Sequence, residues 1–142
     1  MLWQYPEEEA LRLAPLVLAY VGDAVFELFI RCHMVTREVK MNRLHRGTIS
    51  LVSAKAMAKY YKKLEPLLSE REAEVLRRGR NVKTRHHRNT GIGQYHMSTG
   101  FEALVGYLFL SGQEERLEGL LRCLLEEEHG AEEKGQTTDA GS

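Results

Sequence analysis

Residues 16–30 read L-V-L-A-Y-V-G-D-A-V-F-E-L-F-I, and this stretch decides the fold. Its apolar run is long enough for a helix and follows Pro15, a residue that suits a helix start. We therefore predict a long buried helix from Pro15 to about His33. The wider segment 13–30 is not expected to span a membrane, because a carboxylate at the centre of a bilayer is costly and this segment carries Asp23 and Glu27.

Helical signals recur along the rest of the chain, while strand signals are almost absent. Pro6 followed by three glutamates predicts a short helix. Apolar spacing predicts a helix over 41–64 that Pro66 ends, and Ser69 with Glu72 forms a capping box for a helix to about Arg80. Helices are further expected from Ser98/Thr99 to about Ser111 and over 114–128. The prediction is an all-α domain of about six or seven helices over 1–128, followed by a polar, disordered tail over 129–142.

Composition fits a small globular protein, with 43% hydrophobic and 28% charged residues among 142. The two cysteines, Cys32 and Cys123, lie in apolar contexts without a paired ligand motif, and we expect them to be buried free thiols in a reducing compartment. The acidic start does not resemble a signal peptide. A cytoplasmic protein is expected.

Charge is segregated along the chain although the formal net charge is zero. Residues 1–30 carry a net −4, residues 101–142 carry −7, and residues 31–100 carry +11. A basic block of this kind suits the phosphate backbone of a nucleic acid, because the local field recruits the polyanion. The alternative is a set of solvated helix faces.

Asp23 is the first candidate for chemistry. Aspartate is a poor helix former, its neighbour Gly22 costs about 1 kcal/mol relative to alanine, and burial of an unpaired carboxylate costs more. These penalties suggest a compensating role such as metal binding. The alternative is a polar stripe with Glu27, one turn later, or ion pairs with basic residues of 31–100.

Glu102 repeats this pattern in the apolar segment 99–110, T-G-F-E-A-L-V-G-Y-L-F-L. Here Thr99 and Glu102 also match a capping box, in which Glu102 would only satisfy the start of a helix. Two carboxylates from two helices, completed by water and phosphate oxygens, are a common way to hold Mg²⁺. Such an ion promotes hydrolysis of a phosphodiester.

Two segments together resemble the ribonuclease III family. The segment 18–27, L-A-Y-V-G-D-A-V-F-E, is similar to the family signature L-E-F-L-G-D-A-V-L, and 101–110 is similar to its second acidic motif, E-A-L-I-G-A-I-Y-L. Matching by position makes Asp23 and Glu102 the catalytic and metal-binding acids. Glu27 would support them without touching the metal itself. Ala19 and Thr99 stand where the family has further acids, so the resemblance implies fewer acidic ligands.

These departures, the segment 77–81 (R-R-G-R-N), and the absence of a following double-stranded-RNA-binding domain resemble the Mini-ribonuclease III branch. The resemblance implies a ribonuclease III-like endonuclease fold and Mg²⁺-dependent cleavage of double-stranded RNA, with Mn²⁺ able to substitute. It further implies a homodimer that cuts opposite strands, leaves 5′-phosphate ends and matures the large-subunit (23S) ribosomal RNA precursor. The helix at 16–30 and residues 1–5 are candidate dimer contacts.

RNA binding is expected from a basic segment that leads into a glycine-containing loop over 81–97. Without a second domain, the nuclease domain has to grip the duplex through phosphates, 2′-hydroxyls and groove shape. The candidates are Arg77, Arg78, Arg80, Lys83, Arg85, His86, His87 and Arg88. Two rival functions are a non-catalytic RNA-binding factor in ribosome assembly, and a helical DNA-binding or scaffolding protein using Lys40 to Lys63.

Overall fold

The computed structural model describes residues 5–38, 40–83 and 91–139, with side chains up to Glu126, and the described residues form helices without strands. The α-helices are α1 (Glu7–Arg12), α2 (Pro15–Val35), α3 (Met41–Val52), α4 (Ala54–Leu64), α5 (Glu70–Arg80), α6 (Ile92–Leu110) and α7 (Glu114–Asp139). A 3₁₀ turn over Glu65–Leu67 follows α4. The predicted all-α class is confirmed.

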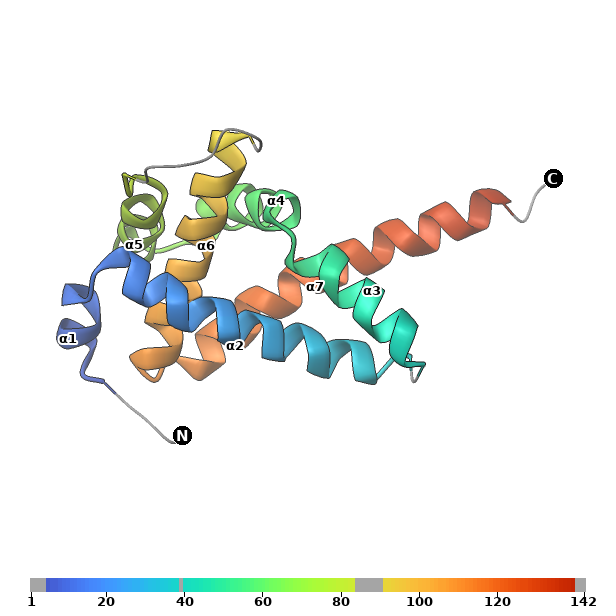
Figure 1. Cartoon of the computed structure of the whole chain (residues 1–142), viewed down its shortest axis with the longest axis horizontal. Helices are drawn as coiled ribbons and strands as arrows, with labels where there is room; N and C mark the ends of the chain where they lie inside the picture. Colours follow the sequence, from blue (N-terminus) through green and yellow to red (C-terminus); the bar gives the residue numbers. More distant parts are fainter. Residues whose placement is uncertain (1–4, 39, 84–90, 140–142) are drawn as a thin grey trace.

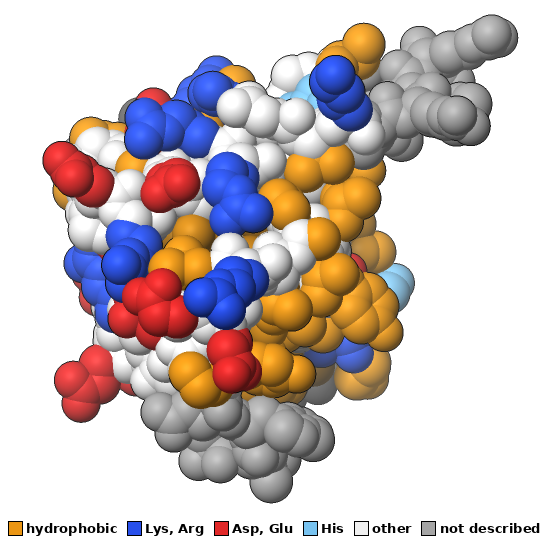
Figure 2. All heavy atoms as spheres, turned by 90° about the vertical axis from the view of Figure 1, so that its left-hand side faces the viewer, with side chains coloured by type: hydrophobic (Ala, Val, Ile, Leu, Met, Phe, Trp, Pro, Cys, Tyr) orange, Lys and Arg blue, Asp and Glu red, His pale blue; other side chains and the backbone are white. Residues whose placement is uncertain are grey.

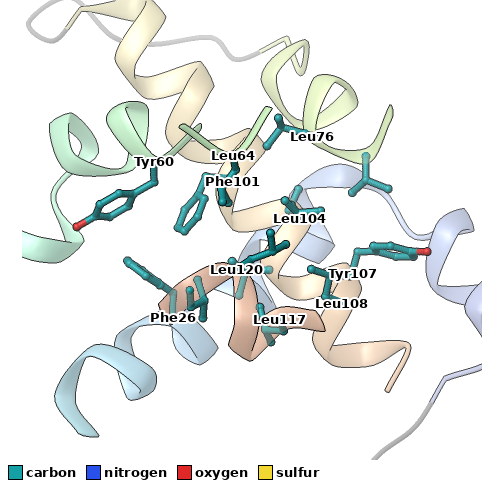
Figure 3. Packing of buried hydrophobic residues seen from close by; sticks show 14 of the residues in the cluster. Phe26, Tyr60, Leu64, Leu76, Phe101, Leu104, Tyr107, Leu108, Leu117 and Leu120 are labelled. Atoms are coloured by element: carbon teal, nitrogen blue, oxygen red, sulfur yellow. The ribbon is translucent and has the colours of Figure 1, made fainter. Parts of the chain in front are cut away.

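Helix α6 is the centre of the fold, and α1, α2, α4, α5 and α7 all contact it (Figure 1). Phe101 on α6 packs edge-on against Phe26 of α2, with ring centroids 4.9 Å apart (Figure 3). Tyr60 of α4 joins them at 5.5 Å from Phe101. Because these three rings are fully buried, they fix α2, α4 and α6 relative to one another.

Three helices were predicted with the wrong extent, and one of them is α6, which begins at Ile92 and not at Ser98/Thr99. The segment expected to be one helix over 41–64 is two helices, because Ser53 has extended backbone and its hydroxyl caps α4 by accepting from the Ala56 amide. Helix α7 continues past Glu128 to Asp139, so the backbone of 129–139 is helical where we expected a disordered tail. Figure 1 shows this last part projecting away from the other helices.

Other local predictions have clear outcomes. The capping box is present, since the Ser69 hydroxyl accepts from the Glu72 amide and the Glu72 carboxylate accepts from the Ser69 amide. The cysteine prediction was wrong in part: Cys32 is exposed and Cys123 is half-buried, and both are free thiols. Cys32 is exposed because it lies off the face of α2 that carries the buried residues Gly22, Phe26 and Ile30.

Candidate active site

Helices α2 and α6 cross with their backbones in contact, and two glycines make this possible. A Cβ atom on Gly22 would lie 1.7 Å from the carbonyl oxygen of Glu102, and one on Gly106 would lie 1.9 Å from the carbonyl oxygen of Leu18. Neither position tolerates a side chain unless the helices separate. The crossing therefore places the residue after Gly22, Asp23, beside Glu102.

Asp23 and Glu102 differ in exposure. Asp23 is exposed on α2, whereas Glu102 on α6 is partly covered. Burial raises the pKa of Glu102 to about 8, and the negative charge of Asp23 adds to this effect. At neutral pH, and without a cation, Glu102 therefore holds a proton beside the Asp23 carboxylate.

This pair fits a divalent cation that prefers oxygen ligands. Two neighbouring carboxylates leave the remaining positions to water and phosphate oxygens, as is usual for Mg²⁺. A bound cation would offset the costs of burial and of repulsion by Asp23 that raise the pKa of Glu102. Among the residues whose placement is described, no group of three or more His, Cys, Asp or Glu side chains forms a candidate metal cluster.

The penalty argument for Asp23 was wrong in its physical basis. Asp23 is not buried, and Gly22 is explained by the close helix crossing rather than by a functional compensation at Asp23. What singles out Asp23 in the structure is its position next to Glu102. That these two acids act together as catalytic groups stays a prediction.

The capping alternative for Glu102 is excluded. Helix α6 begins at Ile92, seven residues before Thr99, so neither Thr99 nor Glu102 lies at a helix start. The Thr99 hydroxyl instead donates to the Tyr95 carbonyl oxygen at 3.1 Å, one turn earlier. Glu102 is a carboxylate in the middle of an apolar helix.

Ala19, Thr99 and Glu27, the other positions that the family motifs singled out, differ in their burial and contacts. Ala19 on α2 and Thr99 on α6 are both buried. Neither residue has a carboxylate, so neither brings a third acid to the pair. Glu27 accepts a hydrogen bond from Arg31 at 3.1 Å on the surface of α2. This is the ion-pair alternative that the sequence left open for Glu27.

The predicted RNA-binding residues on α5 and just after it are basic and lie at or near the surface. Arg77 and Lys83 are exposed, while Arg78 donates to the Leu11 carbonyl oxygen at 3.0 Å. The guanidinium of Arg80 lies 5.8 Å from the centroid of the Tyr61 ring. The other four candidates, Arg85, His86, His87 and Arg88, lie outside the described residues.

A lysine row on α4 was missed as part of this surface. Lys55, Lys59 and Lys62 line one cavity of about 600 Å³ together with Gly91 and Gly93 at the start of α6. Their spacing of four and three residues places them on one face of a helix, and this spacing was visible in the sequence. The row adds positive charge beside the start of α6.

One face of α2 is apolar and exposed. Leu16, Val17, Tyr20 and Leu28 are 46–80% exposed, with Tyr20 the most exposed. Tyr20 and Asp23 also line a cavity of about 580 Å³ with Tyr5 and Phe109. In Figure 2 hydrophobic side chains gather along one side of the molecule, whereas charged side chains of both signs alternate over the rest of that face. Exposed apolar side chains that gather on one face of a helix are typical of an interaction surface.

Residues 16–113 match the model of the ribonuclease III domain, which covers both acidic segments. The chain belongs to the ribonuclease III family, in its Mini-ribonuclease 3 branch. It is 47% identical over 115 residues to Mini-ribonuclease 3 of Symbiobacterium thermophilum, covering 80% of this chain and 88% of the relative. For the Thermoanaerobacter Mini-ribonuclease 3 the identity is 45%, with 81% and 82% covered.

A solved structure agrees with this family membership. A Fusobacterium nucleatum protein determined by X-ray crystallography superposes with a TM-score of 0.74 and 28% identity, covering 82% of this chain and 95% of that protein. Among the described residues of this family member, no helix has the length and apolarity to cross a membrane.

Proposed function

We propose that this member of the ribonuclease III family is a Mg²⁺-dependent endonuclease for double-stranded RNA, with Mn²⁺ able to replace Mg²⁺. The observation that carries this proposal is the pair formed by Asp23 and Glu102 at the crossing of α2 and α6. The two acids come from the two segments that match the family motifs, and the family model covers both. Their oxygen ligands suit a hard divalent cation.

The two acids have different tasks in this proposal. Asp23 is exposed, so its carboxylate is accessible to a water molecule and to the RNA backbone. Asp23 and Glu102 are the residues that would hold the cation through their carboxylate oxygens, and the charge of the cation would favour the deprotonated form of Glu102. The bound ion supplies stabilisation of the negative charge that develops at the scissile phosphate. Water adds to phosphorus and gives up a proton, the bond from phosphorus to the 3′-oxygen breaks, and that oxygen takes up a proton, so the products carry a 3′-hydroxyl and a 5′-phosphate.

Basic side chains on α4 and α5 support binding of an RNA duplex. Lys55, Lys59 and Lys62 on α4 add to the predicted group on and after α5. Duplex RNA is bound mainly through its phosphates and 2′-hydroxyls, which suits Lys and Arg side chains on rigid helices. We further propose that the natural substrate is the precursor of the large-subunit ribosomal RNA.

The active form in this proposal is a homodimer that forms through the exposed apolar stripe of α2. Asp23 and Tyr20 line the same cavity, so dimerisation at this face brings the two sites close enough to cut opposite strands. Replacing Tyr20 by Glu places a charge in the stripe, and we expect sedimentation equilibrium to show monomers where the unchanged chain forms dimers. An unchanged dimer would refute this interface.

The decisive variant for the catalytic proposal is Asp23→Asn. Cleavage of a long RNA duplex in Mg²⁺ should fall by about a thousandfold or more, a loss of about 4 kcal/mol in transition-state stabilisation, while the duplex still binds. Glu27→Gln is the matched control on the same helix, and it should keep most of the activity. If Asp23→Asn cleaves normally, the assignment is wrong, and if the unchanged chain binds but never cleaves, the non-catalytic RNA-binding alternative holds.

A further inference from the structure

Arg80 at the end of α5 lies over an aromatic ring. Its guanidinium carbon is 5.8 Å from the centroid of Tyr61, which belongs to α4. The Arg80 Nε also donates to the side-chain oxygen of Asn81 at 3.3 Å. A guanidinium group over a ring is attracted by the electrons of the ring face, so this contact restricts the orientation of the arginine.

The ring of Tyr61, and not its hydroxyl group, makes the favourable contacts of this side chain. The residue is 2% exposed, and within the described part of the chain its hydroxyl is buried without a hydrogen bond of good geometry, although the Glu65 carboxylate lies near enough to raise its pKa together with burial. A buried unpaired hydroxyl costs free energy. The favourable contacts of Tyr61 are therefore those that its ring makes with the core and with Arg80.

The ring itself is held firmly by a close approach of α5 to α6. A Cβ atom on Gly100 would lie 3.0 Å from the Tyr61 Cε2 atom and 2.6 Å from the Leu76 carbonyl oxygen. A Cβ atom on Gly79 would lie 2.7 Å from the Gly100 Cα atom. The two glycines bring the last turn of α5, the backbone of α6 and the Tyr61 ring into direct contact, so Arg80 projects from a rigid base.

We propose that Tyr61 is a positioning residue for RNA binding: its ring holds the Arg80 guanidinium ready to contact a phosphate of the duplex. This inference rests on the proposed function, since it assumes that Arg80 contacts RNA. An arginine fork that is already oriented loses less side-chain entropy on binding a phosphate. The ring is the part of Tyr61 that matters, so phenylalanine replaces it and leucine does not.

The test compares Tyr61→Phe with Tyr61→Leu by fluorescence anisotropy on a labelled RNA duplex in EDTA. Tyr61→Leu should weaken binding by about fivefold, and Tyr61→Phe should bind like the unchanged chain. Arg80→Ala should reduce the salt dependence of binding by about one phosphate contact. Adding Tyr61→Leu to Arg80→Ala should cause no further loss, whereas adding it to Lys83→Ala, the exposed control, should multiply the two losses.

A measurement without RNA separates the two proposals. The ¹⁵N NMR order parameter of the Arg80 Nε–H group should fall in Tyr61→Leu and stay unchanged in Tyr61→Phe. Normal Arg80 ordering and RNA affinity in Tyr61→Leu would overturn the positioning role, as would equal losses in the Phe and Leu variants. Failure of the unchanged chain to bind RNA would instead overturn the proposed function, even if Tyr61 orders Arg80.

Discussion

Replacing Glu102 by Gln should stabilise the metal-free protein, and the gain should grow with pH. Burial and the Asp23 charge raise the pKa of Glu102 from 4.5 to about 8, so folding takes up a proton throughout this range. A group with a raised pKa gives its full stabilisation below the unfolded-state pKa and loses it as the pH rises through the folded-state pKa. Wild-type stability should therefore fall between pH 5 and pH 8, while Gln, which does not titrate, avoids this loss.

The size of the effect follows from the linkage between protonation and folding. Each pH unit in this range lowers the free energy of unfolding by about 1.4 kcal/mol, so the variant should gain about 3 kcal/mol on the wild type between pH 5 and pH 7. For a domain of this size that corresponds to a Tm difference of roughly 10 °C. The assay is thermal unfolding by circular dichroism in EDTA at each pH.

Two companions make this experiment specific to the pair. Glu27→Gln, on the surface of α2, should leave the pH dependence close to that of the wild type. Asp23→Asn removes the neighbouring charge, which should lower the pKa of Glu102 and move the loss of stability to lower pH. If Glu102→Gln and the wild type show parallel stability curves, Glu102 is not perturbed and the argument fails.

Two further predictions concern the scaffold. Gly22→Ala should cost more than about 3 kcal/mol of stability, because its Cβ would lie 1.7 Å from the Glu102 carbonyl oxygen. The control Gly119→Ala has open space around its Cβ and should gain up to about 1 kcal/mol. Equal Tm values for the two variants would contradict the backbone crossing. Glu72→Gln should cost about 1 to 2 kcal/mol at pH 7 by weakening the bonds to Arg116, whose side chain is partly exposed. Burial alone would raise the pKa of Glu72, but hydrogen bonds from Arg116 and the Ser69 amide outweigh it and lower that pKa. The stabilisation by the Glu72 carboxylate should therefore be present above pH 4.5 and vanish as the pH falls through the lowered pKa of Glu72 in the folded state. Urea titrations at pH 3 and pH 7 check this, and the same difference in unfolding free energy between wild type and variant at both pH values would contradict it.

The long helix α2 was predictable from its sequence because its apolar run and Pro15 agree with each other. The exposure of Asp23 was not, since α2 is apolar on nearly every side and α6 covers only part of it. Leu16, Tyr20 and Leu28 therefore lie on the surface although their residue types suggest a core. Sequence periodicity identifies a helix of this kind and leaves its inward face undetermined.

The start of α6 could not be predicted because its local signals oppose a helix. Gly91 and Gly93 are poor helix formers, and the N-terminal position has no side-chain cap. Packing of the following turns against α2, α4 and α5 stabilises the helix instead. For Gly22 the packing partner, the Glu102 backbone, lies far away in the sequence, so its structural reason appears only in the fold.

The most direct test of the central claim is cleavage of a long RNA duplex by the unchanged chain and by Asp23→Asn, each in Mg²⁺ and in EDTA. We predict that only the unchanged chain in Mg²⁺ produces fragments with 5′-phosphate ends, and that the variant still binds the duplex in EDTA. Cleavage that persists in EDTA, or in Asp23→Asn with Mg²⁺, would contradict a metal-dependent site built on Asp23 and Glu102.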